Sequence, residues 1–149
     1  MPAERGFTLI ELLVVLAIIG LVLGLVPTLL WRPQAGLDVG VAARAIADGL
    51  RQTRSAALSS NREQVFMLDL GERQFRAGRA SPLEPLNEAL ELRLYTASAE
   101  LIDAQSGQIR FFQDGSSTGG RITLALDRQR AEVTVDWLTG QVAVADAAP

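Results

Sequence analysis

One long apolar run dominates the N-terminal part of the chain. Residues 7–31 read FTLIELLVVLAIIGLVLGLVPTLLW, and Glu11 is the only charged residue among them. As a helix this run would measure roughly 36 Å, at ~1.5 Å per residue, which is enough to cross a hydrocarbon core of about 30 Å. Only MPAERG precedes the run, and nothing after Trp31 has the small residues of a secretory cleavage site. The pattern predicts a transmembrane helix that stays in the mature protein.

Helical periodicity continues in residues 37–58. There the apolar residues fall on one stripe while most arginines fall elsewhere, and the stripe consists of Val39, Ala43, Ile46, Leu50 and Ala57. We predict one long helix. Its first half, residues 7–31, lies in lipid, and its second half, residues 32–60, lays the stripe on a soluble domain. Residues 59–61 read Ser-Ser-Asn and are expected to end it.

After residue 60 the apolar period changes from about four to two. The alternation is clearest in residues 90–94, 122–126 and 133–137, with shorter apolar runs at 65–70, 109–112 and 142–144. Alternation of this kind is typical of half-buried antiparallel strands. About seven strands are too many for one flat sheet of this length. The predicted fold is therefore α+β, with a long N-terminal transmembrane helix packed on a C-terminal antiparallel β-sandwich.

Two finer expectations concern the predicted sandwich, which takes up residues 61–149. Trp137 continues the alternation of Val133 and Val135, so we expect its side chain in the core. Residues 78–89 read GRASPLEPLNEA and are rich in turn-forming residues, so we expect them to form a mobile surface segment.

The composition removes several kinds of chemistry. The chain has no cysteine and no histidine, and its 14 basic residues are all arginine. Thiol nucleophiles, disulfides, the usual zinc sites, histidine bases and lysine Schiff bases are excluded. The net charge of -3 is unlike the basic surface of a nucleic-acid-binding protein. We expect no cofactor and no metal.

Glu11 requires an explanation because it lies within the apolar run. A carboxylate at the centre of a membrane helix costs about 2.5–3.5 kcal/mol, and less near an interface. If the chain were cut between Gly6 and Phe7, a new ammonium would appear at Phe7. Glu11 of one subunit could then neutralise that ammonium on a neighbour. The alternative is that Glu11 only reaches the headgroups from the membrane edge.

The segment Gly6-Phe7-Thr8-Leu9-Ile10-Glu11 resembles the processing and methylation motif of type IV pilins and type II secretion pseudopilins. The resemblance implies that a prepilin peptidase removes residues 1–6 as a leader and methylates Phe7. It also implies that Glu11 aids docking into a growing filament. The leader is less basic than is usual in the family, because Glu4 offsets Arg5. We nevertheless expect the leader to be cytoplasmic.

Two C-terminal stretches are also distinctive, FQDGSSTGG at residues 112–120 and VDWLTG at residues 135–140. The first is not a phosphate-binding loop, since strand residues and not a helix follow its glycines and no lysine is present. From the residues alone, both stretches are turns between strands. Asp114 is expected to bond backbone NH groups of its turn, and Gly140 to have a positive φ.

Together, the two stretches resemble the C-terminal region of the H-type minor pseudopilins (GspH) of type II secretion systems. The signature residues are Asp114, Gly115, Ser116, Ser117, Trp137, Leu138, Thr139 and Gly140. The resemblance implies a single-pass inner-membrane protein with a periplasmic domain, later incorporated near the tip of a pseudopilus that exports folded proteins across the outer membrane. The implied partners are other minor and major pseudopilins, prepilin peptidase and the inner-membrane assembly platform.

Three alternatives stay open at this point. The same N-terminal motif would suit a minor pilin of a type IV pilus, acting in adhesion, motility or DNA uptake. Arg121, Arg128 and Arg130 could bind DNA from one hairpin, although a solvated hairpin face balanced by acids explains them more simply. An anchored periplasmic enzyme would have to use carboxylates, and its candidates are Asp103, Asp114 and Asp136. Nucleic-acid binding and enzymatic activity are not expected.

Overall fold

The computed structural model describes residues 9–30 and 39–146, and for residues 21–30 it describes the backbone alone. The chain divides into two compact units, Met1–Gln34 and Ala35–Pro149, which are described separately. The leader, Gly6 and Phe7 lie outside the described residues. So do residues 31–38, and with them the predicted continuity of one long helix.

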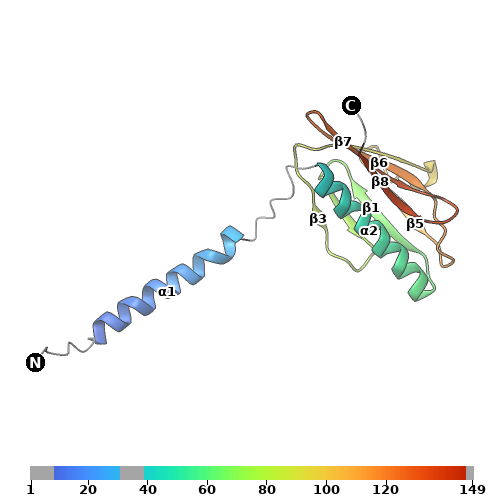
Figure 1. The fold of residues 1–149 in the computed structure, drawn as a ribbon. Helices are drawn as coiled ribbons and strands as arrows, with labels where there is room; N and C mark the ends of the chain where they lie inside the picture. The colour runs from blue at the N-terminus through green and yellow to red at the C-terminus, as the bar shows by residue number, and fades with distance from the viewer. Residues whose placement is uncertain (1–8, 31–38, 147–149) are drawn as a thin grey trace, which may run out of the picture. The chain divides into compact units, whose positions relative to one another are not determined.

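The N-terminal unit contains helix α1, Leu9–Leu30 (Figure 1). Glu11 lies in its first turn, where a carboxylate favours the positive end of the helix dipole. Every side chain described in this helix, from Leu9 to Gly20, is exposed, including nine large apolar ones. Among the residues that the structure describes, no helix is long and apolar enough to cross a membrane.

The second unit begins with helix α2, Val39–Ser60. All five residues of the predicted stripe are buried. The helix ends as predicted at its Ser-Ser-Asn segment. Asn61 takes the left-handed conformation, with φ of 51°, and the NH of Arg62 donates to the carbonyl of Ala57 at 3.3 Å. This is the 6→1 bond of a Schellman cap, which accounts for the sharp end of α2.

The strands form two antiparallel sheets of four strands each. The first has the order β3-β2-β1-β5 and the second the order β4-β6-β7-β8. The chain visits the second sheet once, through β4, before it returns to the first through β5. The bounds are Gln64–Asp69 (β1), Gln74–Ala77 (β2), Glu84–Pro85 (β3), Glu91–Thr96 (β4), Ser106–Phe111 (β5), Gly120–Leu126 (β6), Gln129–Val135 (β7) and Val142–Asp146 (β8), with a 3₁₀ turn η1 at Ser98–Glu100.

Helix α2 packs against both sheets and shares one hydrophobic core with them (Figure 1). It contacts β6, β7 and β8 of the second sheet and β1 and β2 of the first. The rings of Phe66 and Phe75 stack with centroids 5.4 Å apart, and Gly49 of α2 faces their edges. The alternating residues predicted to be core are buried at Ile109, Ile122 and Val133.

The predicted pair of antiparallel sheets is confirmed, and the structure differs from the sequence-based expectations in three details. The described residues form eight strands, because β2 and β3 are too short to show a period. Residues 78–89 are not simply a surface segment, since they contain β3 and the buried side chain of Leu86. Trp137 is not in the core. Its side chain follows the end of β7 and is 65% exposed.

We predict that Gly49→Ala destabilises the chain although alanine is the better helix former. The new Cβ would lie 2.9 Å from Phe75 Cε2 and 3.1 Å from Phe66 Cε2. Overpacking of this kind costs about 1–3 kcal/mol, against a gain of about 1 kcal/mol in helix propensity. Thermal unfolding of the full chain in detergent measures the difference. The matched control is Ser55→Ala on the exposed face of α2, expected to change stability by less than about 0.5 kcal/mol. A gain in stability for Gly49→Ala would contradict the packing described.

Candidate assembly site

Residues 112–120, which join β5 to β6 and include the first residue of β6, form a segment closed by its own polar groups. The carboxylate of Asp114 accepts bonds from the backbone NH of Ser116 at 2.9 Å and from its hydroxyl at 2.6 Å. Gly115 has a φ of +85°, a value that glycine adopts without strain. The expected role of Asp114 as a turn-closing residue is confirmed. We call residues 112–120 the DGSS loop.

Residues 136–140 connect β7 to β8 and form a second closed turn, which we call the Trp137 turn. Oδ1 of Asp136 accepts bonds from the backbone NH groups of Leu138 and Thr139, at 3.1 and 2.7 Å, and from the Thr139 hydroxyl at 2.8 Å. Gly140 donates its NH to the carbonyl of Asp136 at 2.9 Å and has the predicted positive φ, 63°. One carboxylate therefore organises the whole turn.

Arg54 of α2 joins these two segments. Its Nε donates to the carbonyl of Gly115 at 3.1 Å, and its Nη2 donates to the carbonyl of Thr139 at 2.8 Å. The planar guanidinium has its donors in a fixed fork, so one side chain can hold two carbonyls in a set relative position. Arg54 was not predicted from the sequence as a functional residue, because its position off the apolar stripe is typical of a solvated arginine.

The two segments also touch directly. The NH of Ser117 donates to the carbonyl of Trp137 at 2.9 Å. A Cβ on Gly140 would collide with the carbonyl oxygen of Gly115, and a Cβ on Gly119 would lie 3.0 Å from the Cβ of Trp137. The glycines of both signatures are therefore needed for close approach as well as for their φ values.

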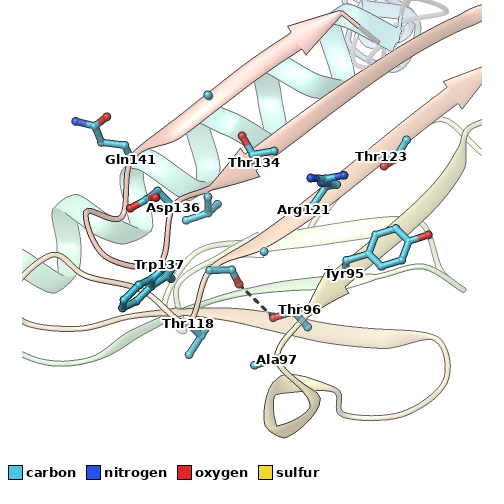
Figure 2. Close-up of a pocket in the computed structure, with 14 residues that line it drawn as sticks. Tyr95, Thr96, Ala97, Thr118, Arg121, Thr123, Thr134, Asp136, Trp137 and Gln141 are labelled. Atoms are coloured by element: carbon cyan, nitrogen blue, oxygen red, sulfur yellow. Dashed lines mark hydrogen bonds between the residues drawn. The ribbon is translucent and has the colours of Figure 1, made fainter. Parts of the chain in front are cut away.

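The signature residues divide into two groups by exposure. Ser117 is buried and its hydroxyl accepts from the NH of Gly119 at 3.0 Å, whereas Trp137 and Leu138 are 65% and 63% exposed. The two apolar side chains thus project from a turn whose backbone is held in place. Trp137 lines an open groove on the outer face of the second sheet, with Tyr95 and Arg121 among the other lining residues (Figure 2).

The candidate carboxylates of the enzyme hypothesis are separate turn residues. Hydrogen bonds from Ser106 and Gln105 lower the pKa of Asp103, those from Ser116 lower the pKa of Asp114, and those from Thr139 and Leu138 lower the pKa of Asp136. All three are therefore ionised near neutral pH, and each is committed to its own turn. Hydrolysis by a carboxylate pair needs one acid with a raised pKa, which none of these three has.

The arginines of the nucleic-acid hypothesis are spread along their hairpin. Arg121 faces Thr134 in the register of β6 and β7, while Arg130 faces Ala125, four residues along β6 from Arg121 and therefore about 13 Å away. Nε of Arg121 lies 3.5 Å from a carboxylate oxygen of Glu132. This arrangement fits the solvated, acid-balanced face and not a phosphate-binding cluster.

Comparisons with known proteins agree with the two signatures. Residues 1–27 match the family model of the prokaryotic N-terminal methylation motif, and residues 42–140 match that of the type II transport protein GspH. The chain is also 38% identical over 138 residues to the type II secretion system protein H of Xanthomonas campestris pv. campestris, covering 93% of this chain and 81% of that protein.

Two solved structures have the same fold. The minor pseudopilin EpsH from the type 2 secretion system of Vibrio cholerae superposes with a TM-score of 0.58 at 13% identity, covering 73% of this chain and 97% of that one. The type IV minor pilin FimU of Pseudomonas aeruginosa gives a TM-score of 0.50 at 13% identity, covering 74% and 92%. At these identities the likeness concerns the fold alone.

The methylation motif and the two-sheet domain with its helix define a pilin-like chain. Within that class, the chain belongs to the type II transport protein GspH family. It is accordingly a minor pseudopilin of type II secretion, in a family of structural subunits that is not known for enzymes.

We predict that Arg54→Met loosens both signature segments. The substitution keeps the apolar stem of the side chain but removes the donors to Gly115 and Thr139. The loss of charge-assisted bonds is expected to cost about 1–2 kcal/mol of stability, discounted for partial exposure. Hydrogen exchange should accelerate at the amides of Ser116 and Thr139, two amides held within these segments.

The matched control for this substitution is Arg51→Met. Arg51 lies on an exposed part of the same helix, where it pairs with Asp48 at 2.9 Å and makes one long bond to a backbone carbonyl, that of Val142 at 3.3 Å, against the two such bonds of Arg54. An exposed pair of this kind contributes about 0.5 kcal/mol or less. Equal losses of stability in the two variants, or unchanged exchange in the signature segments of Arg54→Met, would contradict the role given to Arg54.

Proposed function

We propose that this minor pseudopilin is inserted in the inner membrane by residues 7–31, released from its leader between Gly6 and Phe7, and then assembled near the tip of a secretion pseudopilus. In this proposal, residues 1–6 are cytoplasmic and residues 61–149 form the periplasmic domain. Residues 32–60 connect the two and include the amphipathic helix. The role of the protein in this proposal is to help start the pseudopilus that exports folded proteins across the outer membrane.

The observation that carries the proposal is the unpartnered apolar surface of α1. Its described side chains are all exposed, among them Leu9, Leu13 and Leu16 at 79%, 56% and 56%. Apolar residues all around a helix need lipid or other apolar helices to cover them. When a subunit moves from the membrane into a filament, neighbouring apolar helices replace the lipid around α1. The same segment can therefore serve in both states.

Processing supplies the electrostatic reason for assembly. A cut after Gly6 would create an ammonium at Phe7, and methylation would keep its positive charge. Glu11 lies one helical turn further on and is the only charged residue of residues 7–31. Its carboxylate, if paired with the ammonium of a neighbouring subunit, would not have to be buried alone in an apolar bundle. The match to the methylation motif over residues 1–27 supports this assignment.

The proposed partners follow from the system to which the family belongs. They are prepilin peptidase for cleavage, the inner-membrane assembly platform for extraction, and other minor and major pseudopilins for the filament. A minor pilin of a type IV pilus is the second candidate, because FimU has a similar fold. The GspH family match and the related protein of X. campestris favour secretion over the pilus.

Deletion of the gene is expected to abolish release of exported proteins and leave twitching movement unchanged. The wild-type chain should restore release.

Glu11→Leu should insert into the membrane as well as the wild type, because it removes a charge from the apolar run, yet fail to restore release. Glu11→Asp is the matched control, since it retains the carboxylate and should restore part of the activity. Loss of twitching with normal secretion would overturn the assignment to secretion, and full activity of Glu11→Leu would overturn the charge-pair account.

A further inference from the structure

The Trp137 turn displays two large apolar side chains from an ordered backbone. Its backbone is held by three groups: its NH groups donate to the carboxylate of Asp136, and its carbonyls accept from the NH of Ser117 and from the guanidinium of Arg54. The turn's own carboxylate and two segments distant in the sequence thus hold a turn whose Trp137 and Leu138 side chains stay more than half exposed.

This combination of order and exposure is typical of a binding surface. Exposed single apolar residues are common, but a rigid aromatic residue with an apolar neighbour is the usual anchor of a protein–protein contact. The backbone is already ordered before binding, so little further entropy is lost when a partner covers the two side chains. The domain itself gains little from burial of Trp137, because most of this side chain is in water.

Next to the turn lies a groove across the outer face of the second sheet, of about 960 Å³. The groove has Trp137 toward one end and Tyr95 toward the other, with Arg121 on the neighbouring strand to Tyr95 (Figure 2). Threonines and glycines line much of the rest, including Thr134 and Gly119. We call these residues the sheet groove. Small side chains form the floor of the groove and aromatic side chains lie toward its two ends, so a segment of another chain can fit between them.

The charges of the sheet groove indicate what that segment carries. Asp136 accepts three hydrogen bonds from its own turn on one oxygen, so that oxygen is already engaged within the turn. Arg121 is 57% exposed, and its contact with Glu132, at 3.5 Å, is longer than a good charge-assisted bond. The guanidinium of Arg121 therefore remains available and favours a carboxylate on the partner.

We propose that the Trp137 turn and the sheet groove bind another pseudopilin subunit, whose surface offers an apolar pocket for Trp137 and Leu138 and a carboxylate for Arg121. The inference rests on the proposed function, because it needs a second subunit in the same filament. A second copy of this chain is the alternative occupant, and the cross-linking experiment below distinguishes it from another pseudopilin.

The test uses the full chain, expressed in membranes together with the other pseudopilins of its own secretion system. A photo-reactive benzoylphenylalanine in place of Trp137 should cross-link to another pseudopilin, identified by mass spectrometry. The same group in place of Leu83, which is 43% exposed and lies outside the sheet groove, is the matched control and should give no such product. A cross-link to a second copy of this chain, to an exported protein alone, or to nothing would overturn the proposal.

Substitutions measure the contribution of each contact. Trp137→Ala should reduce the co-purified pseudopilin at least about tenfold, as truncation of an aromatic anchor does. Arg121→Glu should reduce it more than Arg121→Lys, which keeps the charge, and Leu83→Ala should have no effect. The unfolding temperature of Trp137→Ala should match that of the wild type, because the ring is exposed.

These experiments distinguish failure of the docking surface from failure of the proposed function. If Trp137→Ala co-purifies with as much pseudopilin as the wild type does, the docking surface is wrong and the proposed function stands. If the wild-type chain recovers no pseudopilin and instead recovers pilus subunits, the proposed function itself is wrong.

Discussion

The burial of one face of α2 against both sheets is the interaction on which the rest of the C-terminal unit depends. The two sheets alternate in the sequence, so neither is complete until the chain has passed back and forth between them. The helix supplies the apolar surface that they share, with Ile46 and Leu50 fully buried. Gly49 lets it approach the stacked rings of Phe66 and Phe75 without a side chain between them.

The same helix also positions the exposed Trp137 turn. Its buried residues fix the axis of α2, and Arg54, off the apolar stripe, then reaches two backbone carbonyls in loops that follow different strands. A core contact and a surface turn are thereby coupled through one rigid element. This explains how an exposed tryptophan can have a defined position without being buried, and why the glycines beside it tolerate no Cβ.

Much of the fold could be predicted from the sequence because its signals are periodic. The α2 stripe and the alternation around Ile122 and Val133 each repeat over several residues, so the local pattern is enough to predict each element. Strands β2 and β3 have too few residues for a period. Trp137 continued the alternation of β7 in the sequence, but Asp136 captures the following NH groups and turns the chain before the ring can enter the core. Arg54 could not be predicted, since nothing local indicates which distant carbonyls a surface arginine will meet. The same is true of Arg110, which pairs with the nearly buried Glu100.

The central claim is that the N-terminal segment has two uses, as an anchor before processing and as an assembly helix after it, with a cut between Gly6 and Phe7 dividing them. The match of the C-terminal domain narrows the classification from pilin-like chains in general to the GspH family. The exposed Trp137 turn of this domain is the proposed binding surface for a neighbouring subunit. Intact-mass analysis of the chain recovered from membranes with its secretion system tests the claim most directly. The account predicts a mass that lacks residues 1–6 and carries one added methyl group at Phe7. A mass that begins at Met1, or an unmethylated N-terminus in the assembled chain, would contradict it.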